Sequence, residues 1–142
     1  MVAVGNNVHI FARPSRREAL RSLFETVLGC QVATVEHPGM VEPMLIVGLP
    51  GGGHISIEFV DDADDADQPR LATWLELRTA DPAALMQTVL GAGLREVRHP
   101  GHPYLLHGAR WAGVHDRAGH GIVLGARLEL MLTDVEGEGS RP

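Results

Sequence analysis

The chain has 142 residues, 44% of them hydrophobic and 21% charged, and a formal net charge of -6. These values are typical of a globular protein that can bury a sizeable core. The net charge is negative, and no Lys and Arg clusters are interleaved with aromatic residues, so nucleic acid is not expected as a partner.

Targeting and redox signals are equally sparse. No apolar run approaches the roughly 20 residues that span a bilayer, and the N-terminus lacks a basic segment followed by an apolar one. The single cysteine, Cys30, cannot form an intrachain disulfide, which fits a reducing compartment. We therefore expect a cytoplasmic protein with no membrane partner, and a buried structural thiol at Cys30 rather than a nucleophile.

The first predicted element is a strand over residues 7–13, NVHIFAR. Its residues alternate between an aliphatic side and a side that carries His9, Phe11 and Arg13. His9 has three open interpretations at this point: a metal ligand, a residue of a binding pocket, or a polar residue of an ordinary strand.

A helix is expected next, because Ser15 and Glu18 have the Ser-x-x-Glu spacing of a capping box. Its apolar residues recur at helical spacing as far as Gly29, which is a typical helix stop. Three β-type segments follow, QVATVEH, MLIVGLP and HISIEFV, separated by Pro-Gly and Gly-Gly-Gly turns.

An acidic stretch over residues 61–69, DDADDADQP, interrupts this pattern and predicts a solvated linker. The pattern then repeats. TWLELRT alternates like a strand, Asp81 and Pro82 start a helix, and Gly91 and Gly93 end it. Three further strand candidates lie around LREVRH, GARWAGVHD and GIVLGAR.

The repetition predicts an α+β fold of two tandem βαβββ units that form a curved mixed sheet around a cavity. We expect one domain over residues 1–142, with units at about 6–60 and 70–126 and a C-terminal extension over 127–142. The stretch ARLELMLTDV, residues 126–135, is expected to add an edge strand or cover a dimer interface, and disorder is expected from about residue 136.

Four histidines fall between His99 and His115, two of them beside proline in RHPGHPY. Their spacing matches no compact zinc motif, so this segment is interpreted as a polar loop whose role the sequence leaves open.

The organisation resembles the vicinal oxygen chelate superfamily, which contains glyoxalases, bleomycin-resistance proteins and extradiol dioxygenases. Three stretches carry the resemblance: the segment from His9 to VLG at 27–29, the segment WLELRTADPAALMQTVLGAG, and VHDRAGHGIVL at 114–124. Family members usually pair, so the resemblance implies a homodimer. It also implies a small-molecule ligand held in the sheet cavity.

Metal-dependent members of this superfamily take ligands from the first and last strand of each half. Carried over by position, these places hold His9, Glu58, Trp74 and Val123, so two of four are kept. Valine donates nothing to a metal, and an indole offers only an N–H. Glu76 lies on the same predicted strand face as Trp74 and is a possible third ligand. Because the ligand set is incomplete, no cofactor is firmly implied, and a divalent Zn, Ni, Mn or Fe ion is a possible one.

Without a metal, the cavity-facing candidates for ligand contact are Phe11, Arg13, Trp74, Glu76 and Arg78. Trp74 either stacks on a planar or cationic ligand or fills the core. The arginines either hold a carboxylate or pair with the acidic residues of the sheet.

Two functions follow from the resemblance. The first is a glyoxalase- or bleomycin-resistance-like protein that binds a small organic molecule with an incomplete metal site. The second is a divalent-metal-dependent lyase, isomerase or ring-cleaving dioxygenase that uses His9 and Glu58 with Glu76 or water. A metal-free acid–base pair of His9 and Glu58 is a further possibility, so the sequence leaves open whether the protein is an enzyme.

Overall fold

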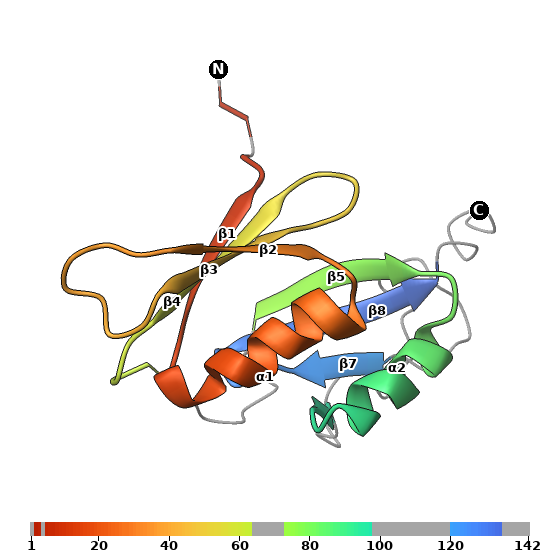
Figure 1. The fold of residues 1–142 in the computed structure, drawn as a ribbon. Helices are drawn as coiled ribbons and strands as arrows, with labels where there is room; N and C mark the ends of the chain where they lie inside the picture. The colour runs from red at the N-terminus through yellow and green to blue at the C-terminus, as the bar shows by residue number, and fades with distance from the viewer. Residues whose placement is uncertain (1, 4, 64–72, 98–119, 135–142) are drawn as a thin grey trace. The chain divides into compact units, whose positions relative to one another are not determined.

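The computed structural model describes residues 2–3, 5–63, 73–97 and 120–134 (Figure 1). The predicted loop from His99 to His115, the strand expected at GARWAGVHD, most of the acidic linker and the C-terminal tail lie outside these residues. The chain divides into two compact units, Met1–Asp65 and Ala66–Pro142, which are described separately.

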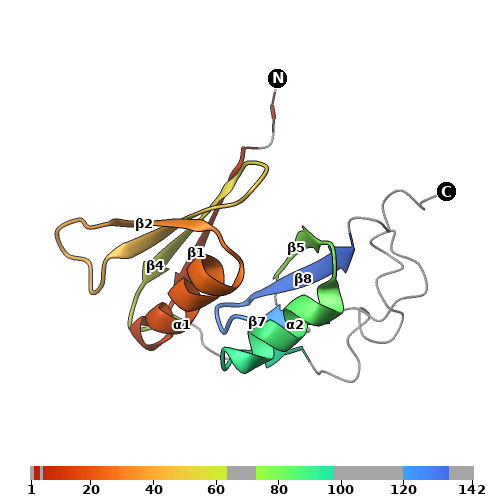
Figure 2. The ribbon, with the colours of Figure 1, turned by 45° about the vertical axis from the view of Figure 1, so that its right-hand side comes forward.

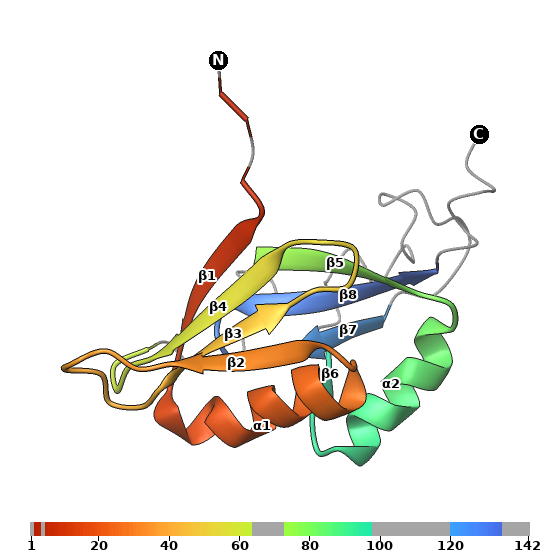
Figure 3. The same cartoon turned by 45° about the horizontal axis from the view of Figure 1, so that its top comes forward.

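The first unit contains a four-stranded sheet in the order β1-β4-β3-β2 (Figure 3). Its strands are β1 (Asn7–Ala12), β2 (Gln31–Val35), β3 (Met44–Gly48) and β4 (His54–Phe59). Strand β1 pairs parallel with β4, and the other two pairings are antiparallel. The predicted alternation is confirmed, because Ile10 and Ala12 are buried while His9 and Phe11 on the opposite face are exposed.

A helical segment connects β1 to β2 in three parts: the 3-10 turn η1 (Pro14–Arg16), α1 (Arg17–Arg21) and the π-helical η2 (Ser22–Val27). Its side chains Leu20, Leu23 and Phe24 are buried. Arg17 lies over the ring of Phe59, 5.9 Å from its centroid, and so joins the helix to the aliphatic face of the sheet.

The capping box expected at Ser15 and Glu18 is wrong, since no side chain caps η1 or α1. Pro14 has a fixed φ and starts the 3-10 turn, so Ser15 lies inside the turn rather than at its boundary. The helix stop is as expected. Gly29 has a φ of +69°, in the left-handed region where a side chain would be strained.

The second unit repeats this architecture with the sheet order β5-β8-β7-β6. Its strands are β5 (Thr73–Thr79), β6 (Arg95–Glu96), β7 (His120–Val123) and β8 (Leu128–Asp134). Helix α2 (Pro82–Gly91) contacts all four strands and buries Met86 and Val89 (Figure 2). The two units thus confirm an α+β fold of tandem βαβββ elements.

The end of the second unit differs from the expectation. Strand β8 lies beyond residue 126, yet it occupies an interior position between β5 and β7. All seven of its residues pair in parallel with β5. The stretch ARLELMLTDV is therefore not an edge strand or an extension, because it supplies one of the two interior strands of its sheet.

Helix α2 begins as predicted, with the Asp81 side chain accepting a hydrogen bond from the backbone N–H of Ala84 at 3.0 Å. We expect Asp81→Ala to lower the free energy of unfolding by about 1 kcal/mol, because the N–H loses its cap. Urea unfolding measures this difference. Asp61→Ala, at an exposed turn position, is the control and should change it little, whereas equal effects of the two changes would contradict a capping role.

Candidate functional site

One face of the first sheet gathers the polar residues predicted for the site. We call this the His9 face and define it by Asn7, His9 and Phe11 of β1 and Ser56 and Glu58 of β4. The parallel register sets His9 opposite Ser56 and Phe11 opposite Glu58. Because side chains alternate along a strand, all five project from the same face, and the opposite face carries the buried aliphatic residues.

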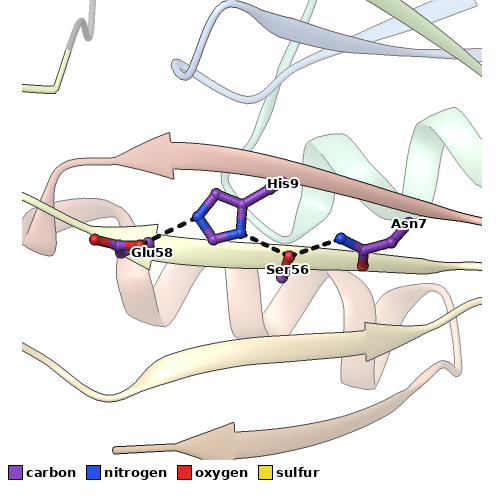
Figure 4. Close-up of polar contacts among 4 residues, drawn as sticks. All are labelled: Asn7, His9, Ser56 and Glu58. Carbon is purple, nitrogen blue, oxygen red and sulfur yellow. Dashed lines mark hydrogen bonds and ion pairs between the residues drawn. The ribbon is translucent and has the colours of Figure 1, made fainter. Parts of the chain in front are cut away.

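His9 is held at both ring nitrogens (Figure 4). Its Nδ1 lies 2.8 Å from the hydroxyl of Ser56, and its Nε2 lies 3.1 Å from Oε1 of Glu58. The amide Nδ2 of Asn7 donates to the same Ser56 hydroxyl at 3.3 Å. The structure therefore brings together His9 and Glu58, and it adds Ser56 and Asn7, which the sequence did not single out.

The His9–Glu58 pair lies partly in solvent, with side-chain exposures of 36% and 35%. A polar contact this exposed contributes little to folding stability. Its consequence is positional, since it fixes a carboxylate and an imidazole side by side where a ligand can reach both. Phe11 is 50% exposed, and its ring meets His9 edge to face at 5.0 Å between centroids, so an apolar surface adjoins the pair.

His9 and Glu58 also fit part of a metal site. The imidazole nitrogen and the carboxylate oxygen are both metal-ligand types, and the 3.1 Å between Nε2 and Oε1 is also the length of an ordinary hydrogen bond. Within the described residues of either unit, no three His, Cys, Asp or Glu side chains are grouped so as to hold a metal ion. The first unit thus offers two ligands.

Arg13 is engaged elsewhere, because its Nε donates to the backbone carbonyl of Ala63 at 2.8 Å. In the second unit, Arg78 Nε lies 3.9 Å from Oε1 of Glu76 on the same strand, as the pairing alternative expected. Trp74 lies in β5, two positions before Glu76. The ligand contacts predicted for these residues stay predictions.

The fourth ligand position needs correction. It was assigned to Val123, but β7 is not the counterpart of β4. Strand β8 is, since it pairs in parallel with the first strand of its unit. With Trp74 at the place of His9, the register puts Glu129 at the place of Ser56 and Met131, opposite Glu76, at the place of Glu58. Glu129 is 2% exposed. Val123 lies directly across from Glu129 in the β7–β8 pairing.

A separate cleft of about 410 Å³ lies at the turn between β3 and β4, where the chain also passes from helix to β2. It is lined mainly by glycines and by Cys30 and His54, and by none of the residues predicted to bind a ligand. Burial raises the pKa of the Cys30 thiol, which keeps it protonated at neutral pH and agrees with a structural role.

Comparison with known proteins gives a result from structure alone. No protein-family model and no curated protein matches the chain. Solved structures match over nearly the whole chain. Glyoxalase I from Leishmania major is similar with a TM-score of 0.64 and 9% identity, over 98% of this chain and 91% of that one.

Two other similar structures concern antibiotics. The fosfomycin resistance protein FosX from Listeria monocytogenes, a complex with Mn(II) and a dihydroxypropylphosphonic acid, has a TM-score of 0.61 and 7% identity, over 99% of this chain and 100% of that one. An antibiotic binding protein from a Streptomyces species has a TM-score of 0.52 and 16% identity, over 94% and 98%. At these identities the likeness establishes the fold.

Proposed function

We propose that this protein, whose fold is that of glyoxalases and antibiotic-resistance proteins, binds a small organic molecule at the His9 face. The observation that carries the proposal is the half-exposed Phe11 beside the His9–Glu58 pair. A carboxylate and an aromatic surface next to each other suit a ligand with an amine or other cationic group and an aromatic ring. The homodimer and the cytoplasmic location stay predictions within this proposal.

A metal-dependent lyase, isomerase or dioxygenase is the second candidate, and it is supported by the imidazole of His9 and the carboxylate of Glu58 lying side by side, since both are metal-ligand types. In that case His9 and Glu58 would be ligands of the ion, with Glu76 or water completing the set as the resemblance implies. A divalent ion would supply Lewis-acid polarisation of substrate oxygens. For His9, ligation through Nε2 requires this nitrogen to give up its proton, after which Nδ1–H would donate to Ser56.

Thermal-shift measurements in EDTA test the first candidate with three matched compounds: an aromatic amine, its neutral isostere and an aromatic carboxylate. A ligand that binds only the folded state raises the melting temperature by mass action. We expect the amine alone to raise it. Phe11→Ala should abolish the shift, and Val41→Ala is the control, because Val41 is a 53% exposed apolar residue in the loop between β2 and β3 and is not part of the His9 face.

The second candidate is tested by equilibrium dialysis with nickel, zinc, manganese or iron(II), followed by elemental analysis. About one metal per chain that is lost in His9→Ala would support the metal enzyme. A shift with the amine in EDTA, without metal retention, would support the binding protein. If no compound raises the melting temperature with or without metal, the proposed ligand class is wrong.

A further inference from the structure

We propose that Ser56 and Asn7 hold the neutral imidazole of His9 in the tautomer that carries its proton on Nε2. In this tautomer His9 positions Glu58, and Glu58 is the group that contacts the ligand. The inference rests on the proposed ligand site and deepens it, because it names the acceptor that selects a donor group and a positioning residue, Ser56, behind it.

The first argument concerns Nε2. Its partner is Oε1 of Glu58 at 3.1 Å, and an ionised carboxylate can only accept hydrogen bonds. The hydrogen must therefore come from the ring, so Nε2 carries a proton whenever this bond is formed. In the neutral imidazole, Nδ1 then has a lone pair and needs a donor.

The second argument concerns Nδ1, and it is independent of the carboxylate. The Nδ2 of Asn7 is a donor, so Ser56 Oγ accepts from it at 3.3 Å. The Ser56 hydroxyl hydrogen is then available for Nδ1 at 2.8 Å. Ser56 is only 5% exposed, which leaves its hydroxyl little solvent as an alternative partner. The first argument requires the Nε2–H tautomer, and the second supplies the donor that its Nδ1 needs, with every bond running from Asn7 through Ser56 and His9 to Glu58.

This direction assigns the roles at the site. With both ring nitrogens engaged, His9 offers no lone pair to a ligand. Oε2 of Glu58, by contrast, has no hydrogen-bond partner among the described residues, and the side chain is 35% exposed. A ligand ammonium or N–H group is therefore recognised by Glu58, while His9 restrains the orientation of the carboxylate.

Long-range ¹⁵N–¹H NMR of ligand-free, histidine-labelled protein tests the tautomer directly. The His9 signals are those missing from His9→Gln, and the pH is raised until the imidazole shifts stop changing. We expect the nitrogen shifts of a protonated Nε2 and an unprotonated Nδ1. A protonated Nδ1, or shifts averaged between the two tautomers, would overturn the assignment.

Variants test the role of Ser56. Ser56→Ala should move the His9 nitrogen shifts towards tautomer-averaged values, and Ser56→Thr, which keeps the hydroxyl, should restore them. Asn7→Ala, at an exposed position, should move them in the same direction by less. Ser15→Ala, at an exposed serine outside the His9 face, is the control.

Unchanged shifts in Ser56→Ala would rule out a positioning role for Ser56. Because the spectra are recorded without ligand, the tautomer prediction can be wrong while the thermal shifts show ligand binding. Likewise, the tautomer can be as predicted while no ligand binds. Loss of the tautomer preference alone refutes this inference, whereas loss of ligand binding alone refutes the proposed function.

Discussion

Replacing Glu58 by glutamine is expected to weaken binding of the aromatic amine by roughly 10- to 100-fold. A hydrogen bond to a charged group contributes about 1.5–3 kcal/mol, and 1.4 kcal/mol corresponds to tenfold in affinity. Glutamine keeps the shape of the side chain and one acceptor oxygen, so the loss reports the negative charge. Isothermal titration calorimetry in EDTA measures it.

The matched control is Glu25→Gln. Glu25 is a surface carboxylate that pairs with Arg21 at 3.7 Å and lies on the helical segment rather than on the His9 face. It changes the net charge by the same amount and should leave the affinity within about twofold. Equal losses in the two variants would mean that only the overall charge attracts the ligand, and Glu58 would lose its assigned role.

Local sequence signals predicted the elements whose ends depend on a single residue. Asp81 and Gly29 each act through their own backbone neighbourhood, a cap in one case and a left-handed φ in the other. The same holds for β5, whose bounds of Thr73–Thr79 match the alternating stretch TWLELRT. Where a local pattern competed with a stronger local constraint, as Ser15 did with Pro14, the prediction failed.

The position of β8 could not be predicted in this way. GIVLG and ARLELML both have the pattern of a strand. Either could be the last strand of the unit, because both come after VHDRAGHG, the segment that resembles the family's turn before that strand. Which of them lies next to β5 depends on pairing between residues more than 50 positions apart, such as Trp74 and Glu129. The alternation of residues along a strand predicts which face is apolar, but it does not predict which strand will pair with it.

The candidate site was predicted only in part for the same reason. Strand alternation was sufficient to place His9 and Phe11 on one face, and the resemblance supplied Glu58. Ser56 and Asn7 went unnoticed, because a serine and an asparagine within strands carry no signal until the register of β1 and β4 sets them beside His9.

The largest effect on stability is expected from Phe24→Ala. Phe24 lies in η2 and its side chain is fully buried. The backbone carbonyl of the same residue accepts a hydrogen bond from the backbone N–H of Cys30 at 2.7 Å. Truncation of a buried phenylalanine costs about 3–5 kcal/mol, because apolar contacts are lost and a cavity remains. Urea unfolding of the full chain measures this loss, and Val41→Ala, which removes an exposed apolar side chain, should cost less than about 0.5 kcal/mol.

The same variant separates stability from binding. The helical segment covers the aliphatic face of the first sheet, where Arg17 lies over Phe59, while the ligand is proposed to bind the opposite face. Under conditions in which Phe24→Ala is still folded, its affinity for the aromatic amine should stay within about twofold of that of the unchanged protein, because distant sites act nearly independently. A large loss of affinity in the folded variant would mean that the ligand depends on the helix-covered core, and the His9 face would then not be the binding surface.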